Sequence, residues 1–232
     1  MRSLFITGTD TGVGKTLVAA SLLTAARARG IHAAPMKSVQ TGCITRGRQL
    51  VAPDLDFCLS AADLNPAPQE RLSMCPYRFI FASSPHLAAA RAGAHIQKET
   101  IRTHFRKILK KYDVIFVEGA GGILAPIDGK NTMLDIMKML RLPVLLVARA
   151  GLGTINHTLL SLAELRRAKL DILGLVAVQS TPGRQGLIEK DNLVMIEKLG
   201  GVPILASFPF QKQLEPAAFA PLLSKVFQAL EK

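Results

Sequence analysis

A short glycine-rich segment near the amino terminus constrains the fold of this chain more than any other feature. Residues 8–16 read GTDTGVGKT. They follow the apolar run 3–7, which predicts a β-strand. They precede the Ala- and Leu-rich stretch 16–29, which predicts a helix that stops at Gly30. A strand, a glycine-rich turn and a helix in this order are the structural context of a phosphate-binding loop.

The residue types of this loop suit a nucleotide phosphate. Small residues let backbone N–H groups point at phosphate oxygens, and the start of the helix adds the positive end of its dipole. The Lys15 ammonium can neutralise β- and γ-phosphates, and the Thr16 hydroxyl can bind Mg²⁺. The usual spacing places a Gly six residues before the Lys, where this chain has Thr9, with Gly8 one residue earlier. The candidate nucleotide-binding residues here are Gly12, Val13, Gly14, Lys15, Thr16 and Leu17.

Strand-length apolar runs alternate with helical patterns along the rest of the chain. Further strands are predicted at residues 32–37, 113–117, 144–148, 172–178 and 203–206, and further helices at 132–140, 155–168, 186–199 and 216–230. This alternation predicts an α/β fold, a mostly parallel sheet flanked by helices. The segment at about 46–96 is less regular and reads as an insertion with short helices near 54–62 and 85–92. We expect a single P-loop NTPase-like domain over residues 1–232.

The composition bounds the function classes. The chain is 49% hydrophobic, which excludes a disordered polypeptide, and its formal net charge is +12. A basic excess suits nucleic acid, an anionic membrane or small anions. Much of it lies on predicted helix surfaces, at Arg102, Arg106, Lys107, Lys110 and Lys111 and at Arg166, Arg167 and Lys169. The longest apolar run, residues 142–148, is too short for a membrane span, and the three cysteines form no CxxC pair. We expect a soluble, cytoplasmic protein with no specific nucleic-acid or membrane partner.

Five motifs together resemble the dethiobiotin synthetase family, the ATP-dependent ligases that close the ureido ring in biotin synthesis. Along the chain they are GTDTGVGKT at 8–16, KSVQTG at 37–42, SSPH at 83–86, VEGAGG at 117–122 and GTINH at 153–157. The family's second motif is K-P-V-x-[ST]-G, so Ser38 stands where Pro is common. The resemblance implies the same P-loop fold and two cofactors of the reaction, ATP as co-substrate and Mg²⁺.

The resemblance also implies a catalytic and a metal-binding set. Lys37 matches the family's catalytic lysine, a cation placed where negative charge accumulates. Thr16, Asp54 and Glu118 match the Mg²⁺-binding set, and hard oxygen ligands suit that ion. Asp56 lies two residues from Asp54, and only the register of the motif favours Asp54 over it. The segment Glu118, Gly119, Ala120 and Gly121 matches further nucleotide-binding positions.

The substrate-binding positions that the family implies are Thr11, Thr41, Gly153 and Asn156. Thr41 also reads as a turn cap, Thr11 as a residue that shapes the loop, and Asn156 as a simple helix cap. In the family, the helix that begins near Gly153 receives the substrate carboxylate from the partner subunit of a homodimer. Orphan N–H groups and the helix dipole favour an anion at such a position.

The base-binding positions depart from the family. Its strand ends V-A-N-D or V-L-N, with the Asn reading adenine, whereas this chain has Val178 followed by Gln179. Val178 cannot hydrogen-bond a base, so Gln179 becomes the candidate. The run Phe208, Pro209 and Phe210 matches the family's base-flanking I-P-W segment, which gives stacking a larger share of base recognition.

The resemblance implies a specific reaction with 7,8-diaminopelargonate, CO₂ or bicarbonate, and ATP as substrates. A carbamate forms, attacks the γ-phosphate, and the second amine closes the ring to give dethiobiotin. Two alternatives stay open. One is an amidoligase-like ATPase of cobalamin biosynthesis, although such proteins usually carry a reactive Cys in a later domain. The other is a partition or positioning ATPase that binds DNA or membrane, although Asp10 stands where those proteins carry a Lys.

Overall fold

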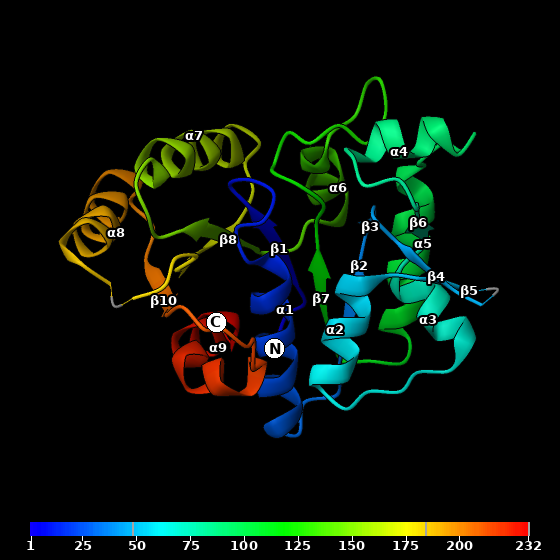
Figure 1. The fold of residues 1–232 in the computed structure, drawn as a ribbon, viewed down its shortest axis with the longest axis horizontal. Helices are drawn as coiled ribbons and strands as arrows, with labels where there is room; N and C mark the ends of the chain where they lie inside the picture. Colours follow the sequence, from blue (N-terminus) through cyan, green and yellow to red (C-terminus); the bar gives the residue numbers. More distant parts are fainter. Residues whose placement is uncertain (48, 184, 232) are drawn as a thin grey trace.

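The protein is built on a parallel β-sheet with helices on both faces, as the sequence predicts. The computed structural model describes residues 1–47, 49–183 and 185–231. Six strands are ordered β10-β9-β8-β1-β7-β2, and every pairing between them is parallel (Figure 1). Their bounds are β1 Leu4–Gly8, β2 Ala33–Lys37, β7 Val114–Glu118, β8 Val144–Arg149, β9 Ile172–Val178 and β10 Ile204–Phe208.

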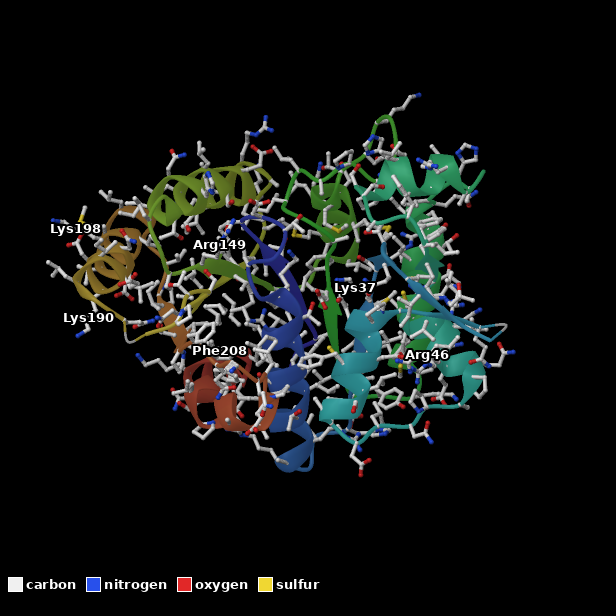
Figure 2. All side chains as sticks on the ribbon, in the orientation of Figure 1. Lys37, Arg46, Arg149, Lys190, Lys198 and Phe208 are labelled. Carbon is white, nitrogen blue, oxygen red and sulfur yellow. The ribbon has the colours of Figure 1, made fainter. Side chains whose placement is uncertain are left out.

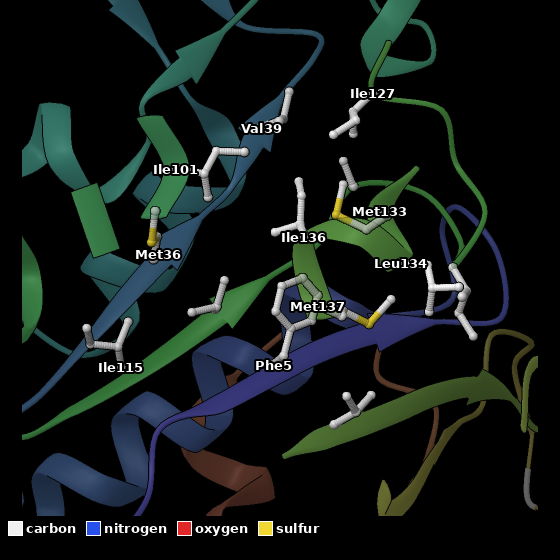
Figure 3. Packing of buried hydrophobic residues seen from close by; sticks show 14 of the residues in the cluster. Phe5, Met36, Val39, Ile101, Ile115, Ile127, Met133, Leu134, Ile136 and Met137 are labelled. Carbon is white, nitrogen blue, oxygen red and sulfur yellow. The ribbon is translucent and has the colours of Figure 1, made fainter. Parts of the chain in front are cut away.

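Helices cover both faces because successive side chains of each buried strand point to opposite sides of the sheet. In β1, Phe5 packs with one apolar cluster, whereas Leu4 and Ile6 pack with the other. The Phe5 cluster includes Ile115 and Met137 (Figure 3). The helices are α1 Lys15–Ala28, α2 Pro53–Ala61, α3 Pro68–Met74, α4 Pro85–Arg91, α5 Lys98–Leu109, α6 Met133–Leu140, α7 Thr154–Arg167, α8 Leu187–Gly200 and α9 Ser224–Glu231.

The last predicted helix differs from the expectation in its first half. Residues Pro216–Leu223 form a 3-10 helix, η1, and only Ser224–Glu231 is α-helical. Pro221 lies inside η1, and proline has no N–H to donate to the carbonyl four residues earlier. The 3-10 helix ends at Leu223, two residues after Pro221, and the α-helix begins at the next residue.

The irregular segment contains more secondary structure than the sequence predicts. Besides α2 and α4 it holds α3 and two short strands, β5 Gln49–Val51 and β6 Tyr77–Arg78. Each pairs with a short strand that precedes the segment: β5 with β4 Ile44–Arg46, antiparallel, and β6 with β3 Val39–Gln40, parallel. Strands of two or three residues are too short to show a periodic pattern. They matter because they fix the chain on either side of Thr41 and in front of α2.

Within the described residues, no helix combines the length and the apolar character that crossing a bilayer requires. The cysteines Cys43, Cys58 and Cys75 are all buried free thiols.

The position of Gly174 in β9 leads to a stability prediction. A Cβ atom at this position would lie 2.8 Å from the Pro203 carbonyl oxygen and 2.7 Å from Leu205 Cγ. We therefore expect Gly174→Ala to lower the free energy of unfolding by about 1–3 kcal/mol, the usual cost of overpacking. The measurement is a urea denaturation curve. Gly129→Ala is the control, because nothing lies within 4 Å of its added carbon; equal stability of the two variants would contradict the prediction.

Candidate active site

The phosphate-binding loop lies between β1 and α1, at the carboxyl edge of the sheet, where ligands of open α/β folds bind. Gly14 precedes α1 with a φ of 102°, a backbone conformation that side chains disfavour. A Cβ on Gly14 would also lie 3.0 Å from the side chain of Val178 at the end of β9. Only glycine allows the loop this close approach, which brings the end of β9 against the nucleotide loop.

Lys15, the first residue of α1, is almost fully buried, at 6% exposure. Its Nζ donates a hydrogen bond of 2.8 Å to the main-chain oxygen of Asp10. Burial lowers the pKa of Lys15 to about 8, with the Lys37 charge acting in the same direction and Glu118 opposing it. The lysine thus sits within the loop, ready for a phosphate but costly to keep charged without one.

This lowered pKa predicts an unusual pH dependence of nucleotide binding. Protonated Lys15 is the form that attracts phosphate, so ATP affinity should fall as the pH rises through about 8. If the neutral form does not bind, affinity at pH 9 should be about tenfold weaker than at pH 7. Equilibrium titration at several pH values measures this. AMP, which lacks β- and γ-phosphates, is the control, and an ATP affinity that stays flat up to pH 9.5 would contradict the prediction.

Lys37 and Glu118 meet because their strands end together. The parallel register pairs Lys37 of β2 with Glu118 of β7, so both side chains lie at the same edge of the sheet. Lys37 Nζ lies 2.6 Å from Glu118 Oε1 and 2.6 Å from Asp54 Oδ2. Burial alone would lower the pKa of Lys37, but the two carboxylates outweigh it and raise the pKa above its ordinary value. Lys37 is therefore a fixed, fully protonated cation at neutral pH.

One further contact completes this cluster. The Thr16 hydroxyl donates a 2.8 Å hydrogen bond to Glu118 Oε1, the atom that also contacts Lys37. Burial of Asp54 opposes its ionisation, yet the Lys37 charge holds the pKa of that carboxyl below its ordinary value. Asp56 instead pairs with Arg71. The geometry therefore separates the two aspartates and places Asp54 in the site.

A cavity of about 420 Å³ brings most of the expected residues together. The expected residues in its lining are Thr11, Gly12, Gly14, Lys15, Thr16, Leu17, Lys37, Thr41, Asp54, Glu118, Ala120 and Gly121. Val39, Gln40 and Leu214 also line it and were not predicted. Gln40 Oε1 accepts a hydrogen bond from the Asp54 N–H, and its Nε2 donates to the Thr41 carbonyl. Gln40 lies inside the KSVQTG motif, so its place in that motif could have identified it as a site residue.

Some expected residues lie outside that cavity. The side chain of Val13, a residue of the loop, is buried, and Gly119 packs tightly against Phe5 and Met133. Gly153, with a φ of 85°, precedes α7, and Asn156 is exposed in the first turn of that helix.

The base-binding candidates require a correction. The Phe208 ring is fully buried and stacks on Phe219 with 4.3 Å between ring centroids, so it is unavailable to a base (Figure 2 labels Phe208). Phe210 is only half-buried, and its neighbour Pro209 is exposed. The Gln179 amide nitrogen donates to the carbonyls of Thr181 and Gly183. Its buried Oε1 has no hydrogen-bond partner within the described part of the chain.

The cluster can hold negative charge in a defined geometry. Two buried lysines stand within one cavity, one on the phosphate-binding loop and one clamped between two carboxylates. Hydrogen-bond donors and cations fixed in advance stabilise charge that develops on a transferred phosphoryl group. Among the described residues, no group of three or more His, Cys, Asp or Glu side chains is arranged to hold a metal ion.

Solved structures similar to this one show the fold. The chain superposes on the MinC:MinD cell division complex of Aquifex aeolicus with a TM-score of 0.64 at 14% identity, covering 100% of this chain and 97% of that one. For a ParA family ATPase of Chlorobium tepidum the TM-score is 0.57 at 16% identity, with 100% of both chains covered. These identities are low, so the likeness supports the P-loop NTPase fold alone.

Sequence comparisons identify the family. A family model described as an AAA domain matches residues 2–218. An ATP-dependent dethiobiotin synthetase BioD of Clostridium novyi is 38% identical over 210 residues, 89% of this chain and 86% of that protein. One of Nitrosospira multiformis is 35% identical over 222 residues, 96% of this chain and 94% of that protein. With its five motifs, its fold and relatives that match along nearly their whole length, this chain belongs to the dethiobiotin synthetase family.

Proposed function

We propose that this protein catalyses the ATP-dependent carboxylation and ring closure of 7,8-diaminopelargonate with CO₂, which yields dethiobiotin, ADP and phosphate. The observation that carries the proposal is the Lys37 ammonium, 2.6 Å from two carboxylates and in one cavity with Lys15 of the phosphate-binding loop. This chemistry requires two anions, a carbamate and a γ-phosphate, to meet, and a fixed cation at their junction is what lowers the barrier.

The reaction proceeds in three steps. One amine of the substrate adds to CO₂ and loses a proton, giving a carbamate. A carbamate oxygen attacks the γ-phosphorus, and the bond from that phosphorus to the β-phosphate oxygen breaks. ADP departs, and a carbamic-phosphoric anhydride is formed. The second amine attacks the carbamoyl carbon, phosphate leaves, and the ring closes. The chain's own residues bind, orient and neutralise: Lys15 at the β- and γ-phosphates, Lys37 at the carbamate and the transferred phosphoryl group.

We further propose that Thr16, Asp54 and Glu118 hold Mg²⁺ together with the nucleotide. The donor set fits, because a hydroxyl and two carboxylates are hard oxygen ligands, and Mg²⁺ usually takes one or two carboxylates with phosphates and water. The Thr16 hydroxyl already lies 2.8 Å from Glu118 Oε1. When bound, the ion would neutralise charge on the β- and γ-phosphates. Lys37 contacts both carboxylates, with 2.6 Å from its Nζ to each.

For the diamine we propose Thr11 and Thr41 as contacts in the same cavity, and a homodimer that brings Gly153 and Asn156 of the partner to the carboxylate. Exposed leucines on and beside α7 support an interface there: Leu152, two residues before the helix, is 91% exposed, and Leu160 and Leu124, which line one hollow, are 63% and 57% exposed. Apolar side chains gathered on one face often mark a protein contact. A substrate carboxylate meets the free N–H groups of α7 at such an interface.

For the base of ATP we propose a site formed by Gln179, Pro209 and Phe210, with the Phe210 ring as the stacking surface. Gln179 follows β9, whose last residue, Val178, lies against the phosphate-binding loop. We also propose the cytoplasm as the compartment, since it supplies ATP and keeps thiols such as the buried Cys58 reduced.

A phosphate-release assay tests the proposed function. Purified protein is given Mg²⁺, bicarbonate and ATP, with and without diaminopelargonate, and the organic product is identified by mass spectrometry. We expect phosphate release to require the diamine and to match dethiobiotin formation mole for mole. Turnover that ignores the diamine would overturn the proposal, and stimulation by DNA or by vesicles would favour a partition-type ATPase.

A further inference from the structure

The segment of the phosphate-binding loop before Lys15 contains an acidic residue, Asp10, in an unfavourable place for a polyphosphate ligand. This residue belongs to the loop that receives the nucleotide, although it lines a separate hollow with Gly122 and His157 and not the cavity of Lys15. A negative charge on the same loop repels a polyphosphate. Arg149, the last residue of β8, pairs with it: Arg149 Nη2 lies 3.4 Å from Asp10 Oδ2 (Figure 2 labels Arg149). The five sequence motifs include neither the arginine nor any residue of its strand.

Asp10 in turn holds two residues of the proposed site. Its Oδ1 accepts a 2.6 Å hydrogen bond from the Thr11 N–H. Its main-chain oxygen accepts the 2.8 Å hydrogen bond from Lys15 Nζ. When a nucleotide phosphate binds Lys15, the ammonium leaves this main-chain oxygen. Arg149 is then the cation that still contacts Asp10, through its carboxylate.

Arg149 is anchored firmly enough to act as a tether. In the parallel register it pairs with Val178 of β9, and the next residue, Ala150, donates a 3.0 Å hydrogen bond to the Val178 carbonyl. The Thr9 N–H donates a 3.0 Å hydrogen bond to Val147 of the same strand. The loop is thus held to β8 at its main chain and, one residue later, at a charged side chain.

We propose that Arg149 is a positioning residue for nucleotide binding that acts through Asp10. It neutralises the Asp10 carboxylate and fixes the part of the loop that carries Thr11 and Lys15. The proposal concerns binding of the nucleotide and rests on the proposed function only in taking that nucleotide to be ATP. Both partners are about half exposed, with side-chain exposures of 47% for Arg149 and 51% for Asp10, so the expected effect is moderate.

The test compares ATP dissociation constants of Arg149→Gln, Arg149→Lys, Asp10→Asn and the double variant. We expect Arg149→Gln to weaken ATP binding by about fivefold, the upper end for an exposed ion pair, and Arg149→Lys to recover at least half of the loss. In the Asp10→Asn background, Arg149→Gln should change the dissociation constant by less than about 1.5-fold, because its partner charge is gone. In turnover, KM for ATP should rise while kcat changes less than about twofold.

Arg2→Gln is the matched control. Arg2 pairs with Asp171 at 3.0 Å with similar exposures of 49% and 59%, so it removes an equivalent ion pair that takes no part in the site. Unchanged ATP affinity in Arg149→Gln would overturn the proposal. It would also be overturned if Arg149→Gln weakened ATP binding equally in the presence of Asp10 and in the Asp10→Asn background, because Arg149 would then contact the nucleotide directly. Because ATP binding is measured without the diamine, a failure of the proposed ligase activity would be seen separately, in the phosphate-release assay.

Discussion

Replacing Lys37 with alanine is expected to reduce diamine-dependent turnover of ATP by about a hundred- to a thousandfold, the usual effect of removing one fixed group that stabilises transition-state charge. Lys37 is the cation that two carboxylates hold at the end of β2, and the other lysine among the described residues that line the cavity is Lys15. Lys15 does not replace it, because in the proposed site Lys15 binds the β- and γ-phosphates.

The measurement is phosphate release under saturating diamine and ATP, with circular dichroism to confirm folding. ATP binding should change much less than turnover, because Lys15 and the loop remain. Lys138→Ala provides the control: Lys138 also pairs with an aspartate, Asp135, but its side chain is 53% exposed on α6. Turnover within about threefold of the unmodified protein would remove Lys37 from the catalytic role.

The sequence predicts this part of the site well for a physical reason. Lys37 and Glu118 each end an apolar strand, and parallel strands bring their carboxyl ends to one edge of a sheet. What the sequence does not give is the strand order, β10-β9-β8-β1-β7-β2, which makes β2 and β7 neighbours. Without that order the 2.6 Å contact between the two side chains is not predictable.

Other parts depend on contacts that no local pattern records. In sequence only the register of the motif favours Asp54 over Asp56, whereas in the structure Asp54 pairs with Lys37 and Asp56 pairs with Arg71. Leu214 reaches the cavity from a loop near the carboxyl terminus, nearly two hundred residues from Lys15. A segment so remote along the chain is placed by tertiary packing alone.

Phe208 shows a different kind of error, one that the sequence had the means to avoid. A family motif placed it beside the base, and the strand expected from the sequence ends at residue 206. In the structure β10 continues to Phe208, which joins Leu205 and Ala206 in one buried cluster. An apolar strand extended to Phe208 is a better guide to the position of its ring than the motif.

Glu118→Gln is expected to lower both activity and stability, and a second substitution should separate the two effects. Gln keeps an oxygen that can accept from Thr16 and Lys37, so the change removes charge and little else. Lys37, whose side chain is only 6% exposed, then retains Asp54 as its remaining carboxylate partner within the described residues. We expect the free energy of unfolding to fall by about 2 kcal/mol, because hydrogen bonds to buried charged groups contribute that much.

The double variant Lys37→Met, Glu118→Gln supplies the decisive comparison. Lys37→Met alone leaves both the 4% exposed Glu118 carboxylate and the 32% exposed Asp54 carboxylate without their cation. The double variant keeps the side-chain volume and removes the Glu118 charge, so that only the more exposed Asp54 lacks Lys37. In urea denaturation, the double variant should therefore lose about 2 kcal/mol less of its free energy of unfolding than the two single variants lose together. Its turnover should stay as low as that of Lys37→Met. If the double variant regains stability relative to the single variants but does not regain turnover, the Lys37–Glu118 pair is assigned to catalysis. Additive stability losses would mean that Lys37 and Glu118 are not coupled, and turnover near normal in Glu118→Gln would show that the carboxylate charge is not needed.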